Sequence, residues 1–293
     1  MPILSARRAG GTAAIGAIAL ALAACSDSDG GSNDEAETDG NAQQGAQAAV
    51  LASYEGLDDQ SYQMDSHMTV DDIDFMDMTL QVEGESSHAT QDIYMSAIME
   101  AMGEDFSGDP EMEEMMESMF ADAHSEAIVV EDVLYMQFSG GGIFEALTED
   151  YGEDAWFTLD LTDDSEISQI YQQVGSFDLR EQTELMLDEL TDVEEVEEGV
   201  FTGTLEADSE AMQTLMNSTG GTANGAELVD DTEVTVTVDE EGLLESVETT
   251  LPEIEGMTIH TVSEVVEIGG SYDIGAPESD NVHTFEEFAG SLQ

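Results

Sequence analysis

Basic residues are nearly missing from this chain of 293 residues, which has no lysine and only three arginines against 69 aspartates and glutamates. Its formal net charge at pH 7 is −66. No basic patch is available to meet phosphates, so the composition excludes a nucleic-acid partner. Molar salt shortens the screening length between such charges to roughly 3 Å. The acidity therefore indicates a halophilic adaptation to a salty exterior.

Cysteine occurs once, at Cys25, which excludes an internal disulfide. Arg7 and Arg8 precede an uncharged apolar stretch at residues 13–24, which is typical of a secretory signal peptide and too short to span a membrane. The stretch ends in LAAC (22–25), which resembles the bacterial lipobox, where the signal is cleaved before a lipidated cysteine. We therefore expect a lipid on Cys25 to anchor the protein to the extracytoplasmic face of the cell membrane.

Three regions follow from these patterns. Residues 1–24 are the expected lipoprotein signal peptide. Residues 25–49 contain the lipidated cysteine and an acidic tether, which has too few large apolar residues to offset the entropy of ordering and is expected to be disordered. Residues 50–293 are long enough for one large β-rich domain.

Alternation of apolar and polar residues predicts most of this domain as strands with one apolar and one acidic face. Glu131-Asp132 separates two of them and predicts a tight hairpin or a bulge. The expected strands are residues 62–70, 76–83, 128–130, 133–138, 156–161, 233–238, 243–251 and 257–268.

Helical spacing is rarer and includes an unusual stretch rich in methionine. In residues 95–120, MSAIMEAMGEDFSGDPEMEEMMESMF, methionines recur at helical spacing after the possible N-cap Asp109 and Pro110. This stripe fits an ordinary core, the lining of a lipid pocket, or a soft-metal site, since thioether sulfur suits Cu(I). The expected helices are residues 95–102, 112–120, 166–174, 180–190 and 208–216.

Motifs of catalysis are not found in the sequence. It contains no nucleophile elbow, no phosphate-binding glycine loop and no calcium loop. The five histidines are irregularly spaced and are expected to be solvated or hydrogen-bonded surface residues. We therefore expect a protein that is not an enzyme and has no cofactor and no dedicated metal site.

The order of several phrases resembles a known family. LYMQFS (134–139), WFTLDL (156–161), VTVTVDEEGLLESVETTL (234–251) and YDIGAPESDNV (272–282) follow the lipobox and tether. This arrangement is similar to the actinobacterial LppX/LprG (LppX_LprAFG) lipoproteins, which share the LolA/LolB-like fold. The resemblance implies an α+β fold, in which several short helices pack in the concave face of a strongly curved antiparallel β half-barrel. It also implies lipid or glycolipid binding or transport between sheet and helices, and a possible membrane transporter as partner.

An apolar ligand would contact the inner side of the strands and helices. The candidate ligand-binding residues on these faces are Met78, Leu80, Met99, Met116, Met136, Phe138, Ile170, Val236 and Ile259. A shift of one residue in the register would move each strand residue to the opposite face. Two alternatives to lipid binding stay open: a Met-rich copper-binding envelope protein, and a structural or sensory surface lipoprotein with a filled core.

Overall fold

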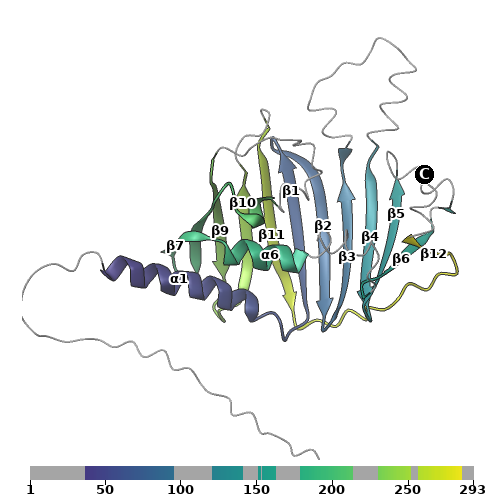
Figure 1. Ribbon diagram of the computed structural model, residues 1–293, viewed down its shortest axis with the longest axis horizontal. Helices are drawn as coiled ribbons and strands as arrows, with labels where there is room; N and C mark the ends of the chain where they lie inside the picture. The colour runs from purple at the N-terminus through teal and green to yellow at the C-terminus, as the bar shows by residue number, and fades with distance from the viewer. Residues whose placement is uncertain are drawn as a thin grey trace, which may run out of the picture. The chain divides into compact units, whose positions relative to one another are not determined.

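The computed structural model describes residues 37–95, 121–140, 151–152, 154–162, 179–213, 230–251 and 257–285. Twelve strands form one sheet in the order β12-β6-β5-β4-β3-β2-β1-β11-β10-β9-β8-β7 (Figure 1). All neighbouring strands are antiparallel except β12 and β6, which are parallel. The sheet is open, with β12 and β7 at its edges. The fold is therefore α+β and mainly β.

The strands span β1 Tyr62–Val70, β2 Ile73–Glu83, β3 Ser86–Ile93, β4 Ala123–Val130, β5 Val133–Gly140, β6 Trp156–Asp160, β7 Thr191–Glu197, β8 Val200–Leu205, β9 Thr232–Val238, β10 Leu244–Thr250, β11 Ile259–Ile268 and β12 Val282–Thr284. The helices are α1 Glu37–Glu55 and α6 Leu179–Asp188. Each strand predicted from alternation is present, and α6 confirms the helix predicted at 180–190. Residues 210–213 are helical inside the predicted 208–216. The predicted helices at 95–102, 112–120 and 166–174 lie outside the described residues.

Tight turns fix the pairing of two hairpins. Glu131 and Asp132 both have positive φ, 52° and 63°, and Val130 pairs with Val133 across them. This geometry is that of a two-residue turn whose twist matches the twist of the strands. It confirms the hairpin and removes the bulge as an alternative. Asp71 and Asp72 make the same turn between β1 and β2.

Helix α1 is the largest difference from the sequence prediction. It begins at Glu37, so thirteen of the residues expected in the disordered tether (37–49) are helical. The low overall hydrophobicity of the segment hid an apolar stripe, because Ala46, Val50 and Tyr54 repeat every four residues and are all buried. The helix contacts β7, β9, β10 and α6, and this packing stabilises it.

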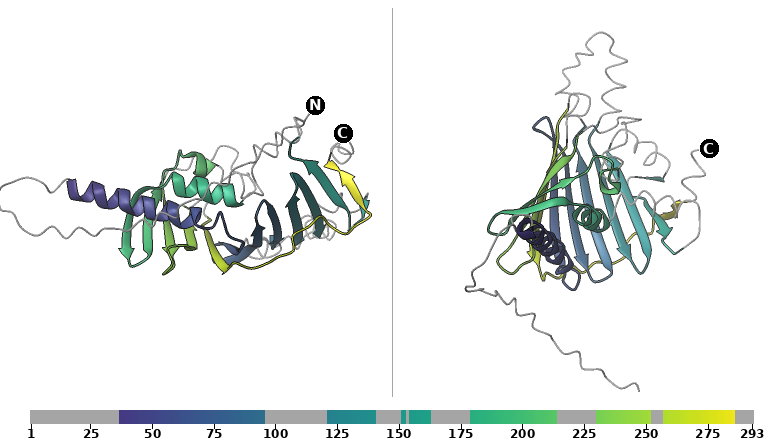
Figure 2. Two further views of the ribbon diagram at one scale, coloured as in Figure 1. Left: turned by 90° about the horizontal axis from the view of Figure 1, so that it is seen from below. Right: turned by 60° about the vertical axis from the view of Figure 1, so that its left-hand side comes forward.

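Two clusters of buried apolar residues form the core. The larger joins α1 and α6 to β1, β2 and strands β7 to β10. The smaller consists of Ala127, Leu134, Met136 and Leu159 on β4, β5 and β6. Figure 2 shows α1 and α6 on the same side of the sheet. Ala89 on β3 packs against both clusters and connects them.

Because one side of α1 packs on the domain, a charge introduced on that side should lower the stability more than a charge on the exposed side. Ala46→Asp should lower the free energy of unfolding by at least about 2 kcal/mol, because it would place a carboxylate among buried apolar residues. Ala49→Asp, at an exposed position of the same helix, should change it by less than about 0.5 kcal/mol. Urea unfolding at molar salt measures both values. Equal, small effects would show that this segment does not pack on the domain.

Candidate functional site

Residues directly opposite each other in an antiparallel pair point to the same side of the sheet. The register therefore traces one row of side chains across nine neighbouring strands, from β8 to β5. This row consists of Phe201, Val236, Val247, Ser263, Ser66, Met78, Gln91, Ser125 and Phe138. We call the side of the sheet that carries this row the apolar face.

Six of the predicted ligand-binding residues lie on the apolar face. Met78, Phe138 and Val236 are in the row itself. Leu80 and Met136 are in the adjacent row, joined through Ala89 and Ala127. Ile259 pairs with Val70, which has the parity of the buried residues of β1. Met99, Met116, Ile170 and Cys25 lie outside the described residues.

Burial divides these six residues into two groups. Leu80, Met136 and Val236 are buried within the two core clusters. Met78, Phe138 and Ile259 are half-buried. Met76 and Ile93, which pair with each other beside Met78, are half-buried as well. Ile259 packs against the larger cluster and Phe138 against the smaller, whereas Met76, Met78 and Ile93 belong to neither. These partly exposed apolar side chains form the candidate contact surface for an apolar ligand.

Polar residues interrupt the row at its centre. Ser66 and Ser263 share a hydrogen bond of 2.7 Å between their hydroxyls. Ser125 donates a hydrogen bond to Oε1 of Gln91, and Gln91 Nε2 donates to Sδ of Met76. The alternation in strand 62–70 places Ser66 on the same face as the apolar residues of that strand, so the sequence could have identified it. Gln91 could not be found in this way, because β3 (SSHATQDI) has no alternation of apolar residues.

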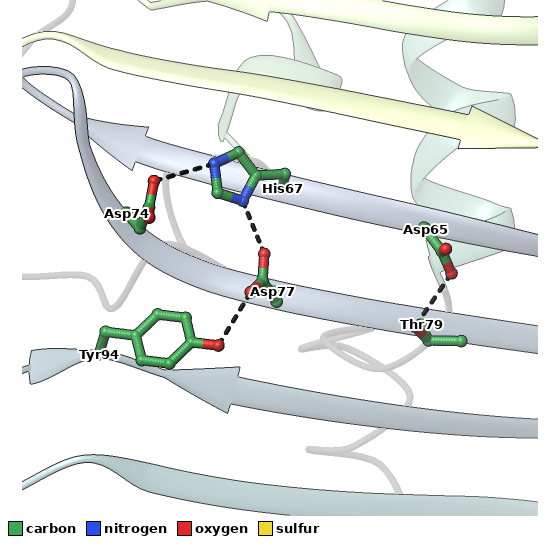
Figure 3. Close-up of polar contacts among 6 residues, drawn as sticks. All are labelled: Asp65, His67, Asp74, Asp77, Thr79 and Tyr94. Carbon is green, nitrogen blue, oxygen red and sulfur yellow. Dashed lines mark hydrogen bonds and ion pairs between the residues drawn. The ribbon is translucent and has the colours of Figure 1, made fainter.

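Histidine–carboxylate pairs characterise the opposite, polar face. Nδ1 of His67 lies 2.6 Å from Oδ1 of Asp77, and Nε2 lies 3.3 Å from Asp74 (Figure 3). The Tyr94 hydroxyl donates a hydrogen bond to the second oxygen of Asp77. The other pairs on this face are His88–Glu126, His124–Asp92 and His260–Glu248.

The fifth histidine, His283, hydrogen-bonds Asn281. All five histidines are therefore hydrogen-bonded, as expected from the sequence. Among the residues that the structure describes, no group of three or more histidine, cysteine, aspartate or glutamate side chains is placed to hold a metal ion. In the same residues, no helix has the length and apolarity needed to cross a membrane.

The His67 pair makes folding sensitive to pH. The hydrogen bond that His67 donates to Asp77, with the charges of Asp77 and Asp74, raises the pKa of His67 above its ordinary 6.5. The contribution of protonated His67 to the free energy of folding is therefore fully present below about pH 6.5. It is lost as the pH rises through the raised pKa. The hydrogen bond from His67 lowers the pKa of Asp77 below 3.8, so that contribution is lost as the pH falls through the lowered value. About half of each side chain is exposed, so the pair is a modest stabiliser.

Replacing the two carboxylates separately tests this arrangement. Asp77→Asn should lower the pKa of His67 more than Asp74→Asn does, because the hydrogen bond that Asp77 accepts from the ring is the largest cause of the raised value. NMR titration of the imidazole protons measures the pKa in each variant. A larger decrease in Asp74→Asn would show that the ring is held mainly by Asp74.

Comparison with protein-family models gives no match for the chain, and a search of curated proteins finds no matching sequence.

Proposed function

We propose that this protein is a membrane-anchored, extracytoplasmic lipoprotein that binds or transfers an apolar ligand, a lipid or glycolipid, without acting as an enzyme. The observation that carries the proposal is the half-buried apolar surface at Met76, Met78 and Ile93 on β2 and β3, which belongs to neither core cluster. Burial of a side chain of this size contributes about 1.5–3 kcal/mol. Because these side chains are already half-buried, a ligand seated here would gain only part of that contribution from each of them.

The placement of the helices supports an apolar site between sheet and helices. Helix α1 contacts α6 and the strands β7, β9 and β10, which lie at or near one end of the strand order. The half-buried residues of β2 and β3 lie toward the middle of that order. We propose that the sheet is a curved half-barrel, with its helices in the concave face and the ligand beside them.

Methionine suits such a surface. Its unbranched and polarizable side chain adapts to partners of irregular shape. Met76 and Met78 on β2 are half-buried, and Met136 on β5 is buried on the same face. A surface of this kind favours ligands with flexible acyl chains over a single rigid molecule.

The signal peptide and lipobox supply the proposed location. Lipid chains on Cys25 would hold the protein at the membrane surface, where a lipid ligand is available. A membrane transporter is a possible partner for transfer. The proposal does not depend on that partner, because binding at the apolar face needs only the ligand.

A matched pair of substitutions in β2 tests ligand binding. Met78→Asn changes the apolar face, whereas Thr79→Asn changes the next residue, which lies on the polar face and hydrogen-bonds Asp65. We expect Met78→Asn to reduce bound lipid about tenfold or more, because the ligand loses its apolar contact with this half-buried methionine and meets a polar amide instead. Thr79→Asn should retain the wild-type amount.

Organic extraction of each purified protein, followed by mass spectrometry, measures lipid per protein. Stoichiometric Cu(I) bound in competition with a chelator, with no lipid in the extract, would favour the copper-binding alternative instead. Absence of both lipid and copper at stoichiometric levels would favour a structural role.

Lipidation predicts a second result. Cys25→Ser should release the protein from the membrane fraction, because no acyl chain could then be attached. Detergent phase partitioning of cell lysates should find wild-type protein in the detergent phase and the variant in the aqueous phase. A conservative change outside the lipobox, Ser26→Thr, is the control and should stay with the detergent. Retention of Cys25→Ser in the membrane would show that another segment anchors the chain.

A further inference from the structure

Four polar side chains lie within the apolar face and contact one another in pairs. We call Ser66, Ser263, Gln91 and Ser125 the polar seam. Ser66 and Ser263 pair on β1 and β11, and Gln91 and Ser125 pair on β3 and β4. Met78 on β2 pairs with both Ser66 and Gln91 and separates the two pairs. Two strand spacings place the pairs about 10 Å apart.

The Ser66–Ser263 pair has one donor more than its internal bond uses. The two hydroxyl oxygens lie 2.7 Å apart, so one hydroxyl donates its proton to the other. Each hydroxyl has one proton, which leaves the second for another acceptor. Either hydroxyl can be the donor; Ser66 is only 7% exposed and Ser263 is half-buried, so the remaining proton is at least partly shielded from water, and leaving it unpaired costs free energy. An acceptor from a bound ligand would satisfy this donor.

Gln91 likewise has an unused hydrogen-bond donor at its amide nitrogen. Its Oε1 accepts from Ser125 at 3.2 Å, and its Nε2 lies 2.6 Å from Sδ of Met76. A thioether sulfur is a weak acceptor, and the amide nitrogen has two protons. Among the described residues, no second acceptor bonds this nitrogen. Each pair of the seam therefore has a hydrogen-bond donor left over on the face where the apolar ligand is proposed to bind.

Charge decides which acceptor fits these donors. Beyond the signal peptide, Arg180 is the only strongly basic residue of the chain, whose net charge is −66. The whole protein would repel a phosphate or carboxylate near the seam, because its 69 acidic residues far outnumber its three arginines. Ester carbonyl and hydroxyl oxygens are uncharged acceptors, so they avoid this repulsion.

We propose that the polar seam recognises an uncharged acyl lipid through its ester or hydroxyl oxygens, while the acyl chains contact the flanking apolar residues. This inference rests on the proposed function and adds the residues that determine which lipid is preferred. Gln91 and the Ser66–Ser263 pair each donate one hydrogen bond to the lipid. Met78 lies between these donors and contacts the apolar part of the ligand.

Binding of three defined probes to the full-length chain tests the inference. Dioleoylglycerol has uncharged acceptors, squalene has none, and oleate is an anion. The chain with Cys25→Ser, kept soluble at molar salt, is titrated with each radiolabelled probe. We expect dioleoylglycerol to bind more tightly than squalene or oleate. Gln91→Leu in this background should weaken dioleoylglycerol binding about threefold to tenfold and leave squalene binding unchanged.

Gln81→Leu is the matched control, because Gln81 hydrogen-bonds Gln63 on the polar face. It should leave binding of all three probes unchanged. Ser66→Ala provides a second test of the seam that removes only a hydroxyl, and the same selective loss is expected. Either seam variant losing dioleoylglycerol and squalene equally would show a structural role and overturn the inference.

Three other outcomes also decide the matter. Unchanged dioleoylglycerol binding in both seam variants would show that the ligand lies elsewhere, so the inference fails while the proposed function stands. Tighter binding of oleate than of dioleoylglycerol would overturn the assignment of an uncharged lipid. Failure of all three probes to bind the otherwise unchanged chain would overturn the proposed function together with the inference.

Discussion

Strand register is the constraint on which the remaining structure depends. Because side chains alternate along a strand, a slip of one residue in any pair would exchange the apolar and acidic sides of that strand. Register shifts between Gln63 and Met64, between Met68 and Thr69 and between Leu244 and Ser246 occur where an extra residue would otherwise invert the pattern. After each of them the apolar residues return to one face. The tight turns at residues 71–72 and 131–132 fix the register of their hairpins directly.

The fold accommodates its extreme acidity because this register leaves the polar face of the sheet available for carboxylates. Carboxylates on the polar face have almost no lysine or arginine to pair with, so histidines take that role between neighbouring strands. His67 joins β1 to β2, His88 and His124 join β3 to β4, and His260 joins β10 to β11. These pairs are strongest when the ring is protonated, which links cohesion of this face to pH. Four carboxylates on the edge strand β7 also discourage pairing with a further strand.

The sequence predicted the strands in which apolar and polar residues alternate. It missed elements whose structure depends on pairing or packing with other segments of the chain. The parity of β1, β2, β5, β9 and β11 was readable, and it brought six proposed ligand residues to one face. Strand β3 was missed because Ser86 to Ile93 contains no apolar alternation, and pairing with β2 and β4 determines its structure. Helix α1 was missed for a different reason, since its sparse apolar stripe of Ala46, Val50 and Tyr54 is buried only against elements distant in the sequence. Because β3 was not predicted, Gln91 and its pair in the polar seam were not identified from the sequence.

The polar seam also bears on whether the apolar face is simply a closed core. A core built only for stability gains from apolar residues at its centre, because each buried polar group must recover the hydrogen bonds that it made with water. The Ser66–Ser263 pair recovers only part of them, and Gln91 directs an amide proton to a sulfur. An uncharged acyl lipid would supply the stronger oxygen acceptors and cover the neighbouring methionines at the same time. The same residues that weaken the face as a core therefore suit it as a binding surface.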